Sequence, residues 1–181
     1  MIYVLLADGF EEIEALTPVD VLRRAGLPLA TVGIGESRVI CGSHGIRVTA
    51  DLSAAEATKP IDMLILPGGM PGADHLDTSP DADALIQRAV REDAPIGAIC
   101  AAPFLLGRRG LLRGKRAVCF PGFESRLEGA TVLKNTRVVT DGRITTAVGM
   151  GAAGEFALAL LAVLRGEEEA ARIRDSAFLH A

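Results

Sequence analysis

The chain alternates short, continuous apolar runs with longer segments in which apolar residues recur every three or four positions. Runs of four to eight apolar residues are typical of strands buried in a parallel sheet, and the longer spacing is typical of helices packed on it. The predicted strands cover residues 2–7, 27–34, 63–66, 95–99 and 115–120, and the predicted helices cover residues 11–26, 53–58, 80–93, 101–110, 154–166 and 167–179. This alternation predicts a flavodoxin-like, doubly wound α/β fold with helices on both faces of a mostly parallel sheet, and residues 1–181 are expected to form one domain.

Two further segments predict hairpins. Residues 38–41 and 46–51 are joined by a Gly-Ser-His-Gly turn, and this hairpin is expected to project from the sheet. Residues 136–149 turn at Asp141-Gly142, a strong hairpin signal. The bounds of the fourth helix stay open, since either Gly107 or Gly110 can end it.

The helical spacing also predicts which faces are buried. In the first helix the apolar stripe consists of Ile13, Leu16, Val19, Leu22 and Ala25, and in the 80–93 helix it consists of Ala84, Leu85, Ala89 and Val90. Pro18 interrupts the first pattern, which predicts either a kink or a restart of the helix with Thr17 as its cap.

Composition excludes several classes of protein. The formal charge of −4 and the pI near 5.4 give no basic surface for nucleic acid. Apolar runs stay shorter than the roughly 18 residues of a membrane span, and Asp8, Glu11 and Glu12 follow the first run too closely for a secretory signal. Three cysteines without CxxC spacing indicate neither a disulfide framework nor a zinc site. We therefore expect a cytoplasmic protein that binds no metal, nucleic acid or membrane.

Cys100 lies where the strand at residues 95–99 passes into a helical pattern. A sulfur at such a turn faces backbone N–H groups and the positive end of the helix dipole, which predicts a pKa below the usual value of about 8.5. The alternative is a buried core cysteine, and position alone does not decide between the two.

Two other segments end at the same edge of the predicted sheet. Gly68 and Gly69 have no side chains, so their N–H groups can approach a ligand and stabilise an oxyanion, although an ordinary tight turn has the same sequence. Glu14 is expected at the buried edge of the first helix, whereas Glu11 and Glu12 have an easier path to water. A carboxyl held beside a thiolate away from water tends to stay protonated and to donate a hydrogen bond to sulfur.

The segments DGFEEIEALTPVDVLRRAG, LPGGMPGA, AICAAP and GMGAAGEFALAL resemble, in this order and spacing, the DJ-1 family of the DJ-1/ThiJ/PfpI superfamily. The resemblance implies that Cys100 is the nucleophilic, oxidation-prone cysteine and Glu14 its partner acid. It also implies that Gly68, Gly69 and Ala101 supply backbone N–H groups. The implied protein is a homodimer without a cofactor.

The sequence departs from the family at two positions. The family's human representative has a histidine before the proline of the segment that matches CFPGFE, where this chain has Phe120. Ala101 follows the cysteine where the superfamily's protease branch has histidine, which argues against a cysteine protease or amidotransferase.

None of the three histidines obviously replaces the missing imidazole. His44, His75 and His180 are expected to be solvated. Even so, His44 stays a candidate for lining the pocket of a neighbouring subunit, and Phe120 and Gly149 are further candidates for the pocket wall. Cys41 and Cys119 are expected to be plain strand residues.

Three functions remain open. The first, which the resemblance implies, is an enzyme that converts reactive dicarbonyls such as methylglyoxal to 2-hydroxy acids, in the manner of a glutathione-independent glyoxalase or a deglycase. The second is a redox sensor or oxidative-stress chaperone that works through oxidation of Cys100. The third is a ligand-binding domain with an inert cysteine.

Overall fold

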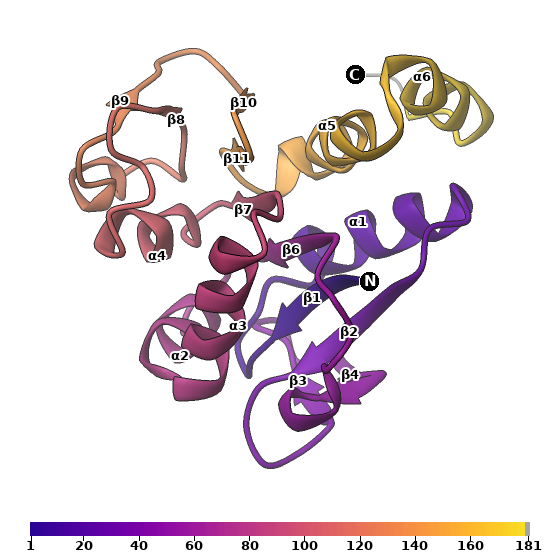
Figure 1. Ribbon diagram of the computed structural model, residues 1–181, viewed down its shortest axis with the longest axis vertical. Coiled ribbons are helices and arrows are strands. Elements are labelled where there is room, and N and C mark those ends of the chain that lie inside the picture. The colour runs from indigo at the N-terminus through magenta and orange to yellow at the C-terminus, as the bar shows by residue number, and fades with distance from the viewer. Residues whose placement is uncertain (180–181) are drawn as a thin grey trace.

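A seven-stranded sheet forms the centre of the molecule in a computed structural model, which describes residues 1–179 (Figure 1). Its strand order is β10-β11-β7-β6-β1-β2-β5, and all neighbours are parallel except the antiparallel pair β10 and β11. The strands are β1 (Ile2–Leu6), β2 (Leu29–Gly33), β5 (Leu52–Ser53), β6 (Met63–Leu66), β7 (Ile96–Ile99), β10 (Val138–Asp141) and β11 (Ile144–Ala147). The predicted α/β fold is confirmed.

β1 demonstrates why the buried strands have continuous apolar sequences. Tyr3 and Leu5 point into the core on one face of the sheet, while Val4 and Leu6 point into the core on the other. Because successive side chains of a strand alternate between faces, a strand covered on both faces must be apolar at every position.

Helices cover both faces of the sheet. α1 (Glu12–Arg24), α5 (Ala153–Arg165) and α6 (Glu167–Ser176) supply one core, and α2 (Gly72–Thr78), α3 (Pro80–Arg91) and α4 (Pro103–Arg108) supply the other. α1 packs against α5, and α5 against α6, as Figure 1 shows. Within residues 1–179 the longest apolar helices fall short of what a membrane span requires.

The buried faces of α1 and α3 differ from those predicted. Ile13 is 49% exposed, and the buried face of α1 instead includes Glu12, Glu14 and Ala15. The helix runs through Pro18 without restarting at Thr17. In α3 the residues facing the core are Ala82, Leu85, Ile86 and Ala89, so the predictions for Ala84 and Val90 were wrong.

Several short elements also differ from the prediction. α2 was not predicted, and the 53–58 helix is a single 3₁₀ turn at Ala54–Glu56. The strand expected at residues 115–120 is reduced to β8 (Arg116–Ala117), which pairs with β9 (Thr131–Val132) outside the main sheet, so Cys119 lies beyond the strand. The hairpin of β3 (Val39–Cys41) and β4 (Arg47–Thr49) is separate from the main sheet, as predicted.

The strand order places a switch point beside β1. From β1 the chain proceeds to β2 on one side and later to β6 and β7 on the other. Ligands of open α/β sheets bind in the crevice that such a reversal leaves beyond the carboxyl ends of the strands. The segments that follow β1, β6 and β7 contain Glu14, Gly68 and Cys100.

Candidate active site

Cys100 occupies a tight turn between β7 and α4. Its φ is +63°, a left-handed conformation that costs a non-glycine residue about 1–2 kcal/mol. Two backbone hydrogen bonds hold the turn: Cys100 N–H donates to the Ala147 carbonyl at 2.9 Å, and the Cys100 carbonyl accepts from Phe120 N–H at 2.8 Å. β11 and the segment after β8 therefore fix a conformation that the residue itself does not favour.

Glu14 reaches the sulfur from α1. Its side chain is buried and forms a hydrogen bond with Cys100, and its Oε2 accepts from Gly68 N–H at 3.0 Å. Burial raises the pKa of this carboxyl to about 7; the Cys100 and N–H hydrogen bonds lower it, and the Glu11 charge adds to the rise. The carboxyl thus titrates near neutral pH.

The pKa of Cys100 moves opposite to the sequence-based prediction. Burial raises it to about 12, and the charge and hydrogen bond of Glu14 add to the rise. The Gly69 and Ala101 N–H groups do face the sulfur and act to lower its pKa. Their effect on the Cys100 pKa is outweighed, because the sulfur is half-buried beside a carboxylate. The helix also starts later than predicted, at Pro103, and is only six residues long.

Gly68 permits the close contact between thiol and carboxyl. A methyl carbon in place of its hydrogen would lie 2.6 Å from both Cys100 Cβ and Glu14 Oε2. The glycine is required by this approach, rather than by an isolated tight turn. Glu11 holds both Gly68 and Glu14 in place. Its N–H donates to the Gly68 carbonyl at 3.0 Å, and its Oε2 accepts from Glu14 N–H at 2.7 Å.

Phe120 and Gly149 border the same site. A methyl carbon on Gly149 would lie 3.3 Å from Phe120 Cδ2, 3.7 Å from Glu14 Oε1 and 3.9 Å from Cys100 Sγ. Beyond it opens a cavity of about 530 Å³. Its wall consists of Phe120, Pro121, Asn135, Thr136, Arg137, Val148, Gly149, Met150, Gly151 and Ala152. Most of the exposed surface of this wall is apolar, and its charged side chain, Arg137, pairs with Glu155 at 2.7 Å.

Glu12 and His44 form a second polar cluster, which sequence reasoning missed. Glu12 was expected near water, yet it is buried, and both of its oxygens accept hydrogen bonds. The donors are the N–H groups of His44 and Ile46, the Ser43 hydroxyl, and the His44 ring at 2.8 Å. The signal available in the sequence was the polar Gly-Ser-His-Gly turn, which lies 32 residues from Glu12 and could not be matched to it by spacing.

This second cluster is the one place in residues 1–179 where three metal-ligating side chains converge, with ligand atoms of Glu11, Glu12 and His44 within 4.8 Å of one another. A cation would have to displace the donors that already occupy Glu12. We therefore assign no metal to it.

Neither His44 nor His75 contacts Cys100. The His44 side chain is 70% exposed and contacts Glu12 rather than Cys100. His75 lies in α2, not in a loop, and its Nδ1 is 2.7 Å from the Asp8 carbonyl oxygen. His180 lies outside the described residues.

Comparisons with known proteins agree with this architecture. The model of the DJ-1/PfpI family matches residues 1–163. The chain is 36% identical over 170 residues to Arabidopsis thaliana protein DJ-1 homolog B, covering 93% of this chain but 39% of that protein. It is 33% identical over 168 residues to a Caenorhabditis elegans protein named glutathione-independent glyoxalase DJR-1.2, covering 92% of this chain and 89% of that one.

A solved structure also resembles this chain in both sequence and fold. Oxidized Toxoplasma gondii DJ-1 superimposes with a TM-score of 0.93 at 34% identity, covering 99% of this chain and 98% of that chain. The order of the strands, the turn that presents Cys100 and the match over nearly the whole sequence lead to one conclusion: this chain belongs to the DJ-1/PfpI family.

Proposed function

We propose that this protein converts small α-oxoaldehydes such as methylglyoxal to 2-hydroxy acids without glutathione. The same chemistry on an early glycation adduct would be deglycase activity. The observation that carries the proposal is the hydrogen bond between Cys100 and Glu14, a carboxyl whose pKa is raised to about 7 by burial. A general base works best when its pKa lies near the operating pH. A relative named as a glyoxalase supports the choice of substrate.

The first step forms a carbon–sulfur bond. The Glu14 carboxylate accepts the Cys100 proton while the sulfur adds to the aldehyde carbon, and the proton then passes to the former aldehyde oxygen. This gives a hemithioacetal and restores the carboxylate. Because the thiol has a high pKa, base assistance during the attack replaces a preformed thiolate.

The second step moves a proton between carbons. The Glu14 carboxylate removes the hydrogen from the carbon bonded to sulfur and returns it to the neighbouring carbonyl carbon, with proton transfer between the two oxygens. The product is the thioester of a 2-hydroxy acid, which water hydrolyses to the acid and the free thiol. Gly69 and Ala101 N–H groups, which face the sulfur, would hold the oxyanion that forms beside it.

The cavity beside Gly149 receives the rest of the substrate. Phe120 and Met150, which are 48% and 54% exposed, and Val148 present apolar surface next to the sulfur. This lining suits the alkyl or aryl substituent of an α-oxoaldehyde. It offers no imidazole, so turnover should be slow, since a positioned general base contributes about 10² to 10⁴ in rate.

The test is release of lactate from methylglyoxal. We expect the wild type to release it and Cys100→Ser to lose at least about 10³-fold in kcat/KM. Cys119→Ser is the matched control, because burial raises the pKa of that thiol to about 11 and it lies outside the site. Lactate release by Cys100→Ser at the wild-type rate would refute the proposal.

Redox sensing is a second candidate, favoured by one feature. Below pH 7 Glu14 is protonated and can donate a hydrogen bond to an oxygen on Cys100. If this function holds, peroxide should add two oxygens to Cys100 before Cys41 or Cys119, as measured by peptide mass. Earlier oxidation of either of the others would exclude it.

We also propose a homodimer formed through the outer face of α1. Ile13 and Ile46 are 49% and 55% exposed, and Ile46 N–H donates to Glu12 Oε1 at 3.4 Å, which places the turn before β4 against the start of α1. Sedimentation velocity should give a dimer for the wild type and a monomer for Ile13→Glu.

A further inference from the structure

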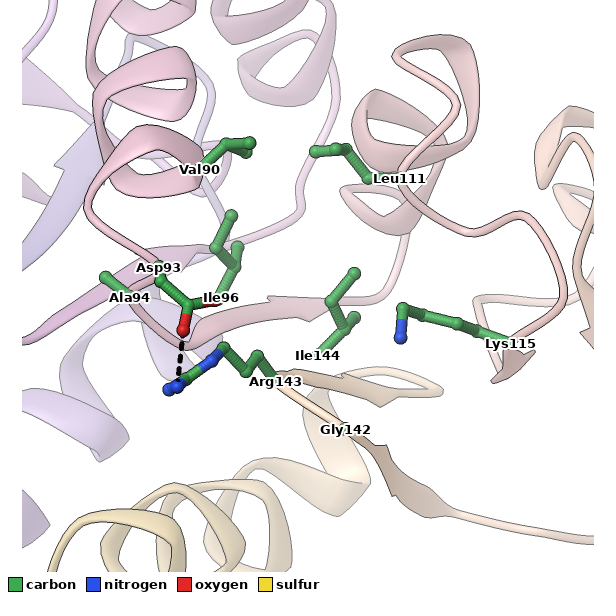
Figure 2. Close-up of a pocket in the computed structure, with 9 residues that line it drawn as sticks. All are labelled: Val90, Asp93, Ala94, Ile96, Leu111, Lys115, Gly142, Arg143 and Ile144. Carbon is green, nitrogen blue, oxygen red and sulfur yellow. Dashed lines mark ion pairs between the residues drawn. The ribbon is translucent and has the colours of Figure 1, made fainter.

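Figure 2 shows the residues that line a second cavity, of about 340 Å³. It lies at the opposite end of β7 from Cys100. Ala94 and Ile96 line it where β7 begins, whereas Cys100 follows the residue at which β7 ends. The other contributors are the end of α3, the segment after α4, and the turn between β10 and β11. The proposed chemistry at Cys100 makes no use of this cavity.

The interior of this cavity is apolar. Figure 2 shows Val90 and Leu111 facing each other across it, with Ile96 and Ile144 pointing in from the sheet. Ile96 and Ile144 are buried, while Val90 is 40% exposed. A small hydrocarbon group would therefore meet a buried apolar floor.

Two cations stand at the rim. The Lys115 side chain extends toward Ile144 in Figure 2, and its Nζ would be 3.2 Å from a methyl carbon on Gly142. Within residues 1–179 the Lys115 ammonium forms neither a hydrogen bond nor an ion pair. Its acidic neighbour Asp141 is already bound by Arg116, whose N–H and Nε lie 3.0 and 3.2 Å from Oδ2. The Lys115 charge also lowers the pKa of the Asp141 carboxyl, but no hydrogen bond joins the ammonium to it, so a ligand carboxylate can compete with Asp141 for Lys115.

Arg143 is the second cation. It pairs with Asp93 at 2.5 Å, but the two side chains are 56% and 75% exposed. Figure 2 shows the guanidinium turned toward Asp93 and away from Lys115. Exposed pairs of this kind contribute little, so a ligand carboxylate bound at Lys115 can draw the guanidinium away from Asp93.

We propose that this cavity binds a free monocarboxylate with a compact apolar body, its carboxylate held by Lys115 and Arg143 and its hydrocarbon group over Ile96 and Ile144. Sites for small ligands combine an apolar lining with a few charged or polar groups that orient the ligand. Lys115 and Arg143 at the rim, with Arg116 beside them, outnumber the acids Asp93 and Asp141, which favours an anion over a neutral or cationic analogue.

The backbone around the cavity is held in place before any ligand binds. Ile96 N–H donates to the Arg143 carbonyl at 2.8 Å, and Ala94 N–H to the Ala89 carbonyl at 2.9 Å. On the other side, Thr131 N–H donates to the Lys115 carbonyl at 2.8 Å. A preformed site loses less conformational entropy on binding than one that must be ordered by its ligand.

The experiment titrates the full chain with cyclohexanecarboxylate, and with the matched neutral and cationic probes cyclohexanemethanol and cyclohexylamine. We expect saturable binding of the carboxylate, measured from amide NMR shifts that map to Ala94, Ile96 and Ile144. The alcohol should bind roughly tenfold more weakly, because it lacks the charge-assisted contacts. The amine should not bind.

Two variants move the affinity in opposite directions. Lys115→Gln keeps the length of the side chain and should weaken carboxylate binding roughly tenfold. Asp93→Asn frees Arg143 and should strengthen it several-fold; Asp93 has a φ of +54°, which asparagine adopts as readily. Lys134→Gln removes an exposed lysine outside the cavity and should leave the affinity unchanged.

The proposal is overturned if the alcohol binds as tightly as the carboxylate, if Lys115→Gln binds like the wild type, or if the shifts map to another surface. Absence of saturable binding up to about 10 mM would also overturn it. Cys100→Ser should bind the carboxylate normally, which separates this site from the proposed catalytic one.

Discussion

Glu12 and Glu14 lie in the same turn of α1, both are buried, and their pKa values move in opposite directions. Burial acts to raise both. At Glu12 it is outweighed by hydrogen bonds from the His44 side chain and from the His44 and Ile46 N–H groups, which lower the pKa to about 2. At Glu14 burial prevails and the pKa rises to about 7.

Hydrogen-bond donors, rather than depth of burial, therefore decide what a buried carboxyl does. Glu12 stays ionised until the pH falls toward its pKa of about 2, and it holds the β3–β4 hairpin against α1. Glu14 faces a thiol, which is a weak donor, and can therefore gain and lose a proton near neutral pH. The first carboxyl is suited to structure and the second to proton transfer.

Removing each charge should affect activity very differently. Glu14→Gln keeps the size of the side chain but cannot accept a proton, so kcat/KM for methylglyoxal should fall by about 10² to 10⁴. Glu12→Gln should change it less than about threefold, because Glu12 does not touch the sulfur. Equal losses in both variants would mean that Glu14 acts only by supporting the fold.

Phe120→His should add a base next to the one already present. Phe120 borders the same space as Glu14 and Cys100, so an imidazole there should raise kcat about tenfold and move the pH dependence toward the titration of histidine. Phe120→Leu is the matched control and should bring no gain. If the two variants behave alike, the missing imidazole does not limit the rate.

The two carboxyls should also give stability opposite dependences on pH. The Glu12 pKa is lowered, so its contribution to the free energy of unfolding is present above about pH 4.5 and is lost as the pH falls toward 2. The Glu14 pKa is raised, so its contribution is present below about pH 4.5 and is lost as the pH rises through 7.

Urea unfolding of the glutamine variants measures this difference. At pH 8, Glu12→Gln should destabilise the protein and Glu14→Gln should stabilise it, each by about 1–3 kcal/mol. Near pH 4 the effect of Glu14→Gln should shrink toward zero. A Glu14→Gln variant that is less stable than wild type at pH 8 would contradict the raised pKa.

The strands of the sheet were predictable because their apolar runs are continuous. The buried face of α1 was not predictable from the sequence pattern. A pattern-based assignment places Ile13 inside and Glu12 outside, whereas in the structure Ile13 is exposed and Glu12 is buried. Burial of Glu12 depends on donors from a hairpin more than 30 residues away, which no local pattern contains. α2 was missed because seven residues with a glycine start and several polar positions carry little helical signal.

The convergence of Glu14, Gly68 and Cys100 followed from the sequence, because parallel strands bring the segments after them to one edge. The direction in which the Cys100 pKa shifts did not follow from the sequence. It depends on how far the sulfur is buried and on how closely the Glu14 carboxylate approaches it, and both are set by the packed sheet.

The Glu14 carboxyl comes from α1, the backbone amides come from the loop after β6, and the Cys100 sulfur comes from the turn after β7. In an incompletely folded chain these groups are apart, so Cys100 has the reactivity of an ordinary exposed cysteine. In the native state burial and the Glu14 charge suppress the thiolate, and separating these segments removes both effects. Alkylation of Cys100 by a small thiol reagent should consequently accelerate when this edge of the sheet opens, which makes the residue a built-in reporter of local unfolding.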